Sequence, residues 1–156
     1  MKTLLNVLGV IFACLVLLLV ALRITGFEPH ARTPGLWLKG DLVTTPVTDW
    51  SFTDKIPEIK VQTQTPFLLP HSVTIWCAVY NGNLYVTSAR GRQWVENVIR
   101  DPHVRIKIVD QVFDRTFSLV DDPAEKAAVL QAKGRKYPQW KVPSLSASAV
   151  FRVNPA

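Results

Sequence analysis

An apolar run near the start of the sequence constrains most strongly what this chain can form. Leu4 to Leu22 contains 19 residues without a charge, and Lys2 and Arg23 flank it. As a helix, the run spans about 28 Å, which is close to the thickness of the hydrocarbon core of a bilayer. The sequence therefore predicts a membrane protein with a single-pass transmembrane anchor over residues 1–23, which contacts the lipid bilayer through residues 4–22.

Two other interpretations of the apolar run stay open. A cleaved signal peptide has an apolar region of about 7–15 residues that ends in a small-residue cleavage site. This run is longer, and it ends in Val20-Ala21-Leu22-Arg23, which is a poor cleavage site. Lipid attachment at Cys14 is the second alternative, but the apolar run continues well past that cysteine. Both observations favour an uncleaved anchor.

The remaining residues, 24–156, have a natural length for one domain. Once Lys2 and Arg23 are taken from the total of 18 Lys and Arg, 16 remain against 12 Asp and Glu, a net charge of +4. This mild charge suits solubility, an anionic ligand or an anionic membrane surface, and we expect no nucleic-acid partner. Cys77 is the only cysteine outside the anchor, so cysteine usage leaves the compartment open.

Residues 24–50 contain too many prolines and glycines for a long helix or strand. The segment is nevertheless rich in large apolar side chains, such as Leu36, Trp37 and Trp50, which would be costly to leave in water. We therefore expect an ordered segment that wraps around the domain.

The rest of the chain has the alternation of short strands. Predicted strands cover residues 59–64, 72–80, 84–88, 104–108, 112–120 and 149–153. Asn81-Gly82-Asn83 predicts a hairpin between the second and third of these. Two helices are expected, over residues 92–100 and from Pro123 to Lys133, the second with Asp122 as a candidate N-cap and Gly134 at its end. Short connections and few helices predict a mainly β fold with some α, a small barrel with short outer helices.

The segment from His71 to Ile108 resembles the core of the pyridoxamine-5′-phosphate-oxidase-like split-barrel superfamily, which includes flavin reductases and deazaflavin-dependent nitroreductases. It reads HSVTIWCAVYNGNLYVTSARGRQWVENVIRDPHVRIKI. A hairpin leads to a Thr/Ser-rich strand end, a basic loop and a short helix, and Asn97 to Val104 fits the N-x-x-x-x-P-x-V turn of the superfamily. The resemblance implies a split β-barrel over residues 24–156, after the transmembrane helix.

The resemblance also implies a cofactor site. Members of the superfamily hold the phosphate of a flavin-type cofactor with hydroxyls and basic side chains from this region. By position, the phosphate-binding residues here are Thr87, Ser88, Arg90 and Arg92, and residues near the cofactor ring are His71 and Trp76. The sequence departs from the superfamily at Gln93, followed by Trp94, where many members carry a loop lysine. The implied cofactor is FMN or a deazaflavin, bound in a homodimer with cofactors between the subunits.

By resemblance, the chain is a membrane-anchored flavin- or deazaflavin-binding protein, an oxidoreductase that passes hydride to a small or lipophilic substrate. The sequence has no metal-ligand spacing, phosphate-binding glycine loop, nucleophile elbow or carboxylate pair, so it names no catalytic residue and argues against a hydrolase. The charges that flank the anchor leave its orientation undecided. If the cofactor comes from cytoplasmic pools, the domain faces the cytoplasm.

Alternatives to the redox interpretation stay open. Gln93 suits a cofactor-free split-barrel interaction module at the membrane. The aromatic segment from Leu36 to Phe52 suits an accessory subunit that packs on a partner. Ordinary structural roles also explain the candidate residues. Arg90 and Arg92 suit a solvated loop, Trp76 suits core packing, and His71 suits a polar group with a hydrogen-bond partner.

Two further features have ordinary explanations. Cys77 suits an inert buried thiol, and the dipole of a helix favours cations at its C-terminus, which explains the basic cluster of Lys133, Arg135, Lys136 and Lys141.

Overall fold

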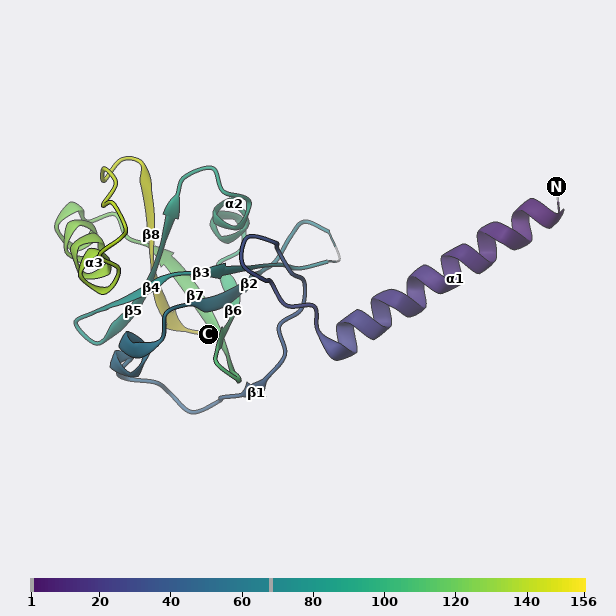
Figure 1. The fold of residues 1–156 in the computed structure, drawn as a ribbon, viewed down its shortest axis with the longest axis horizontal. Helices are drawn as coiled ribbons and strands as arrows, with labels where there is room; N and C mark the ends of the chain where they lie inside the picture. Colours follow the sequence, from purple (N-terminus) through teal and green to yellow (C-terminus); the bar gives the residue numbers. More distant parts are fainter. Residues whose placement is uncertain (1, 68) are drawn as a thin grey trace.

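The computed structural model describes residues 2–67 and 69–156 as an apolar helix followed by a sheet domain (Figure 1). Helix α1, Lys2–Thr25, extends away from the domain, and none of its residues is buried. Within the described residues it is the one helix that is long and apolar enough to cross a membrane, and it lies near the N-terminus. Because its apolar side chains have no partner in the domain, α1 is not a core helix of this chain.

The domain is built from one antiparallel sheet that curves into a half-barrel. Its elements in chain order are β1 (Asp41–Leu42), η1 (Ser51–Lys55), β2 (Ile59–Thr63), β3 (His71–Ile75), β4 (Cys77–Tyr80), β5 (Asn83–Ala89), α2 (Gln93–Arg100), β6 (His103–Ile108), β7 (Gln111–Leu119), α3 (Pro123–Lys136) and β8 (Ser148–Pro155). The strand order is β3-β2-β6-β7-β8-β5-β4, and the two-residue β1 pairs in parallel with β7.

The prediction of one continuous strand over residues 72–80 is wrong, because the chain breaks at Trp76. Its first half, β3, pairs with β2, and its second half, β4, pairs with β5. These halves form the two ends of the strand order although they are neighbours in the chain. A strand that leaves one partner and joins another needs a break in its ladder, so Trp76 marks the point where the barrel is split.

Local signals in the sequence are confirmed at the hairpin. Asn81 and Gly82 both have positive φ, 50° and 74°, as a two-residue turn that follows the twist of its strands requires. The N-cap is also confirmed, because the Asp122 carboxylate accepts hydrogen bonds from the backbone N–H groups of Ala124 and Glu125.

The prediction that the second helix ends at Gly134 is wrong. Helix α3 continues to Lys136, and Tyr137 is its C-cap residue. A Cβ at Gly134 would lie 3.1 Å from Val142 Cγ2, so this glycine allows close packing of the connection to β8. The helix continues because Tyr137 is buried against the break in the sheet, which fixes the last turn from outside.

Two apolar layers lie on the two faces of the sheet. The barrel interior is filled by side chains such as Val61, Val86, Ile106 and Phe151. The outer layer lies between the sheet and α3 and includes Tyr85, Val129, Leu130 and Val150. Along β5 the even-numbered Leu84 and Val86 face the interior, whereas Tyr85 faces α3. The same alternation divides the candidate cofactor residues at the end of this strand.

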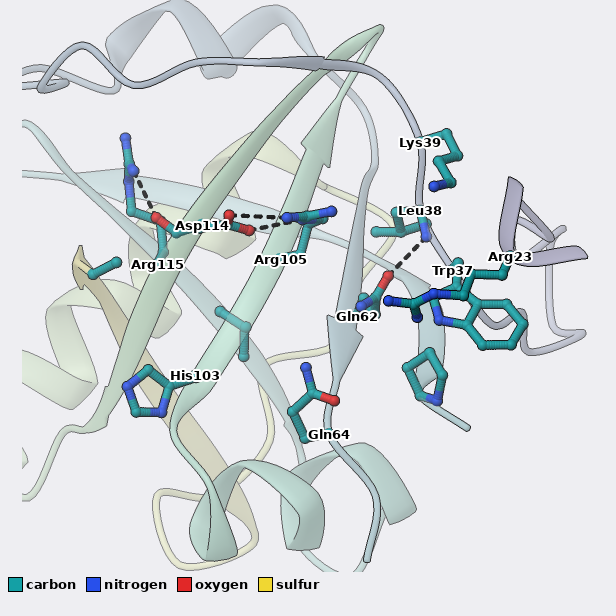
Figure 2. A pocket seen from close by; sticks show the side chains of 13 residues that line it. Arg23, Trp37, Leu38, Lys39, Gln62, Gln64, His103, Arg105, Asp114 and Arg115 are labelled. Carbon is teal, nitrogen blue, oxygen red and sulfur yellow. Dashed lines mark hydrogen bonds and ion pairs between the residues drawn. The ribbon is translucent and has the colours of Figure 1, made fainter. Parts of the chain in front are cut away.

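The segment before β2 is ordered, as predicted from its apolar content. Trp50 belongs to the barrel interior, and Trp37 is buried. The backbone N–H of Leu38 donates to Gln62 Oε1 on β2 at 2.8 Å (Figure 2). Glu28 accepts hydrogen bonds from Lys60 and Lys107. Partial burial acts to raise the pKa of its carboxyl group, but the hydrogen bonds and charges of Lys107 and Lys60 together lower it. These contacts hold the chain that follows α1 against the sheet.

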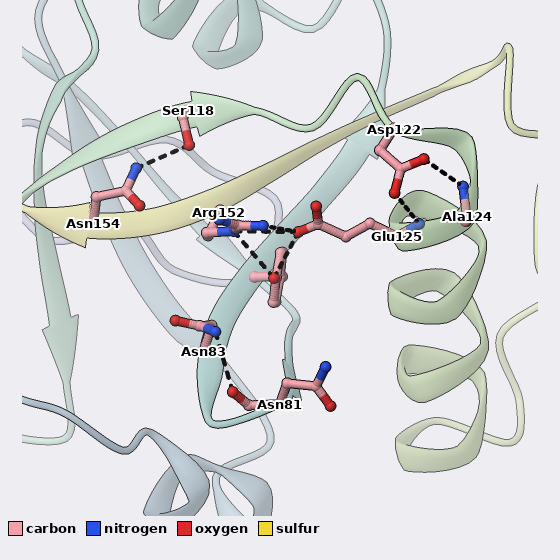
Figure 3. Close-up of polar contacts among 9 residues, drawn as sticks. Asn81, Asn83, Ser118, Asp122, Ala124, Glu125, Arg152 and Asn154 are labelled. Atoms are coloured by element: carbon pink, nitrogen blue, oxygen red, sulfur yellow. Dashed lines mark hydrogen bonds and ion pairs between the residues drawn. The ribbon is translucent and has the colours of Figure 1, made fainter.

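A polar cluster fixes α3 to the outer face of the sheet (Figure 3). The Arg152 guanidinium donates to Glu125 Oε1 at 2.5 Å, and the Tyr85 hydroxyl donates to the same oxygen at 2.7 Å. Hydrogen bonds from Arg152 and then Tyr85 lower the pKa of Glu125. The cluster joins the first turn of α3 to β5 and β8.

Candidate functional site

A groove of about 450 Å³ lies where β3, the loop of residues 31–34 and the start of α2 meet. Three of the residues singled out from the sequence line it: His71 from β3, Ser88 from β5 and Arg92 before α2. Among the described residues that line the groove none is Asp or Glu, whereas Arg32 and Arg92 are both cationic. The groove therefore suits an anionic group that accepts hydrogen bonds.

The local backbone explains why Arg92 faces this groove. Gly91 has a φ of +77°, which turns the chain sharply at the end of β5. Arg92 follows as the N-cap residue of α2, and its carbonyl accepts the N–H groups of Val95 and Glu96. Trp94 is buried and packs on Phe151, with ring centroids 5.8 Å apart. Because Trp94 anchors the first turn of α2, Arg92 at the start of this helix lies at the groove.

A chain of hydrogen bonds runs beneath the groove and joins three elements. Gln93 Nε2 donates to Asn97 Oδ1 at 3.2 Å, and Asn97 Nδ2 donates to Thr63 Oγ1 at 3.0 Å. Thr63 Oγ1 in turn donates to the carbonyl of His71 at 3.0 Å. Asn97 and Thr63 are fully buried, so the chain is shielded from water. It fixes the start of α2 relative to β2 and β3.

His71 lies at the rim of the groove in a partly buried position. Burial lowers the pKa of its imidazole below the ordinary value of 6.5. The ring is therefore neutral at pH 7, and it has one donor and one acceptor nitrogen for a bound molecule.

Thr87 and Trp76 lie on the other face of the sheet, away from this groove. Thr87 faces α3, where its hydroxyl accepts a hydrogen bond from Lys133 Nζ at 2.5 Å. Trp76 stacks on Tyr137 with ring centroids 4.5 Å apart and planes 6° from parallel. Strand alternation and the break at Trp76 thus separate these two residues from His71 and Arg92.

Arg90 does not line the groove. Its Nε donates to the carbonyl of Ser146 at 3.1 Å, and its backbone N–H donates to the carbonyl of Ala147. Arg90 thus contacts the connection between α3 and β8. Arg90 and Arg92 carry the same charge and lie two residues apart, but only Arg92 lines the groove. Arg90 therefore serves as a matched control for Arg92.

A second, smaller crevice of about 290 Å³ lies on the α3 side and contains a buried lysine. Lys133 is 5 % exposed, and desolvation lowers the pKa of its amine to about 8. Its Nζ lies 4.4 Å from the centroid of the Trp140 ring, and in the described part of the chain it forms no ion pair with a carboxylate. The basic cluster of the sequence therefore has one buried member.

The burial of Lys133 could have been found from the sequence. Val129, Leu130 and Lys133 share one face of α3 by their spacing of three and four residues. Arg32, by contrast, carries no such signal, because it lies in an irregular loop that only tertiary contacts place beside β3. Cys77 is buried with its pKa raised by desolvation, and Lys136 Nζ lies 3.5 Å from its Sγ.

The described residues include no group of three or more His, Cys, Asp or Glu side chains that could hold a metal ion.

Comparison with known proteins identifies the fold. No protein-family model and no curated protein matches the sequence. Among solved structures, a candidate pyridoxamine 5′-phosphate oxidase from Listeria innocua has a TM-score of 0.55 and 18% identity, over 67% of this chain and 88% of that one. An F420 reductase has a TM-score of 0.52 and 19% identity, over 72% of this chain and 96% of that one.

A protein from Mesorhizobium loti described as FAD-binding has a TM-score of 0.50 and 16% identity, over 68% of this chain and 86% of that one. Another similar chain, with a TM-score of 0.54, is described as a domain-swapped dimer. The domain therefore has the split-barrel fold of the pyridoxamine-5′-phosphate-oxidase-like proteins, as the sequence resemblance predicts.

Proposed function

We propose that this chain is a membrane-anchored flavin- or deazaflavin-binding protein whose groove at Arg92 holds the cofactor phosphate. The observation that carries the proposal is the meeting of Ser88, Arg92 and Arg32 in one groove without a carboxylate. Its volume of about 450 Å³ lies in the usual range for small-molecule sites. Similarity to an F420 reductase and a FAD-binding protein supports a flavin-type cofactor.

In this proposal the residues of the groove divide the work of binding. The Arg92 guanidinium donates to two phosphate oxygens, and the Ser88 hydroxyl donates to a third. Arg32 adds a second cation from the loop of residues 31–34, and neutral His71 donates to or accepts from the ring system. Gln93 replaces the usual loop lysine with a neutral donor. The bound FMN or deazaflavin supplies the hydride that a small or lipophilic substrate receives.

We further propose that α1 anchors residues 24–156 to a membrane through residues 4–22 and that the domain faces the cytoplasm, where flavins are made. The apolar surface of α1 is unburied in the structure, which supports insertion into a bilayer. By likeness to a domain-swapped dimer, we propose that two copies pair.

The anchor is tested by extracting membranes from expressing cells with carbonate at pH 11. We expect the full chain to stay in the pellet, because about 19 apolar residues hold a helix in lipid irreversibly. The N-terminal peptide should be found in the pellet by mass spectrometry. Release into the supernatant, or a mature chain that lacks residues 1–23, would instead support a signal peptide.

The cofactor site is tested by fluorescence titration of the full chain, in detergent micelles, with FMN and with a deazaflavin. We expect Arg92→Ala to raise the Kd about 10- to 100-fold, because a charge-assisted bidentate contact is lost. Arg90→Ala removes the same charge two residues away, outside the groove, and we expect it to change the Kd by less than about twofold.

The pair of variants separates a built site from general attraction by positive charge. Equal weakening by Arg90→Ala and Arg92→Ala would contradict the assignment of the groove. No saturable binding of either cofactor by a folded wild-type chain would overturn the redox proposal and favour a cofactor-free interaction module. Circular dichroism of each variant shows whether it is folded.

A further inference from the structure

A third cavity is a groove of about 530 Å³ that lies where the C-terminal end of α1 meets the sheet (Figure 2). Four cationic side chains line it: Arg23, Lys39, Arg105 and Arg115. Two of the described residues that line the groove carry a carboxylate, Asp114 in its side chain and Ala156 at its α-carbon, against the four cations. The cofactor proposal does not use this groove, and the excess of positive charge indicates an anionic ligand.

The Asp114 carboxylate is already occupied. Arg105 Nε and Nη2 donate to its two oxygens at 2.7 and 2.9 Å, and hydrogen bonding to Arg105 lowers the pKa of Asp114 although burial opposes it. Arg115 Nη1 donates to the Asp114 carbonyl at 2.7 Å, and its guanidinium lies over the Trp50 ring at 5.5 Å. Arg23 and Lys39, by contrast, are exposed and form no ion pair in the described structure.

Arg23 and Lys39 lie at the junction between helix and domain. Arg23 follows the apolar run directly, and its Cζ lies 5.7 Å from the centroid of the Trp37 ring. Lys39 packs against the chain just after α1, because a Cβ at Gly26 would lie only 2.8 Å from Lys39 Cγ. With α1 in a bilayer, both cations lie within about one to two helical turns of the hydrocarbon edge, at the depth of lipid headgroups.

Other side chains at this end of the domain suit a membrane surface. The connection between β2 and β3 extends toward the side from which α1 leaves (Figure 1). It carries Phe67, which is 81 % exposed and thus far more open to solvent than the large apolar residues of the domain core. Trp37 beside Arg23 is an aromatic residue of the kind found at membrane interfaces.

We propose that this groove binds the phosphate headgroup of an anionic phospholipid in the leaflet where α1 ends. Arg23 and Lys39 donate to the phosphate from the helix side, and Arg105 contributes its remaining N–H groups from β6. The inference rests on α1 being a membrane anchor, but it does not depend on the cofactor. Its consequence is that lipid charge orients the domain on the membrane.

The test is native mass spectrometry of the full chain released from detergent micelles, with dioleoyl phosphatidylglycerol or dioleoyl phosphatidylcholine added. We expect the wild type to retain phosphatidylglycerol about tenfold more than phosphatidylcholine. The Arg23→Gln/Lys39→Gln variant should lose this preference. The control, Arg135→Gln/Lys141→Gln, removes two charges beside α3, at the end of the domain away from α1 (Figure 1), and should keep it.

Three results would overturn the proposal. The first is that Arg23→Gln/Lys39→Gln still prefers phosphatidylglycerol as the wild type does. The second is that the control, Arg135→Gln/Lys141→Gln, loses this preference as fully as Arg23→Gln/Lys39→Gln. The third is displacement of the lipid by 10 mM inorganic phosphate, which would assign the groove to a soluble phosphate compound. Failure of the anchor itself appears separately, as release by carbonate, so the two proposals fail in distinguishable ways.

Discussion

Tyr137→Ala is expected to lower the free energy of unfolding by about 3–5 kcal/mol, the range for truncation of a buried aromatic residue. Tyr137 is 5 % exposed, and its ring stacks on Trp76. Its hydroxyl accepts the N–H of Cys77 at 3.3 Å and donates to the carbonyl of Pro57, 2.9 Å away, or to that of Cys77, 3.0 Å away. One side chain thus satisfies the backbone where the sheet breaks and also ends α3.

The measurement is urea unfolding of the full chain in detergent micelles, followed by tryptophan fluorescence. Tyr137→Phe is the control, because it keeps the stacked ring and removes only the hydroxyl. We expect it to cost about 1–2 kcal/mol. A loss below about 1 kcal/mol for Tyr137→Ala would show that the contact between Tyr137 and Trp76 does not stabilise the break between β3 and β4.

Lys133→Met is expected to raise the free energy of unfolding at pH 7 by about 2 kcal/mol. Desolvation lowers the pKa of Lys133 from 10.5 to about 8 in the folded chain. Each pKa unit corresponds to about 1.4 kcal/mol, so charging the buried amine costs about 3 kcal/mol. Removing the amine avoids this cost, but it also removes the hydrogen bond to Thr87, which lowers the stability by about 1 kcal/mol.

The same substitution should change how stability depends on pH. Below pH 8 the amine is protonated in both states, and the whole cost is present. Between about pH 8 and 10 Lys133 binds more protons in the unfolded than in the folded chain and so raises stability with pH, whereas Cys77, whose pKa is raised by desolvation, lowers stability with pH. Because Cys77 acts in both chains, we expect the stability difference between Lys133→Met and the wild type to shrink by about 2 kcal/mol over this interval.

Urea unfolding of the full chain at intervals between pH 7 and pH 10 measures the effect. Lys141→Met removes an exposed amine nearby and should keep the wild-type slope. An equal dependence on pH for the wild type and Lys133→Met over this interval would contradict the burial of a charged amine beside Trp140. Values above pH 10 are unsuitable, because burial raises the pKa of Tyr137 and thus makes stability fall there.

The candidate site was only partly accessible to prediction. Ser88 and Arg92 follow from the resemblance, and the structure brings them to one groove with His71. Thr87 came with them in the sequence but faces α3, because successive side chains of a strand lie on opposite faces. Arg32 was missed, since a loop without periodicity gives no sign of the strand that it will contact.

Features that depend on a few neighbouring residues were determined by the sequence alone. The apolar helix, the turn at Asn81-Gly82 and the N-cap at Asp122 each arise from local hydrophobicity, positive φ or a side chain that reaches its own backbone. The resemblance to the split-barrel superfamily adds the fold class, and the structure agrees with it. These features would be recognised in any chain that carried the same short segments.

Only the tertiary structure decided the break at Trp76 and the continued helix past Gly134. Nothing in SVTIWCAVY interrupts a strand locally. The break arises because β2 and β5, which lie apart in the sequence, each take half of that segment as a partner. Tyr137, the C-cap residue of α3, stacks on Trp76 at this break. This packing outweighs the tendency of Gly134 to end the helix. Packing between distant segments outweighs local preference here, because burial of a large aromatic side chain exceeds the cost of about 1 kcal/mol for one helical glycine.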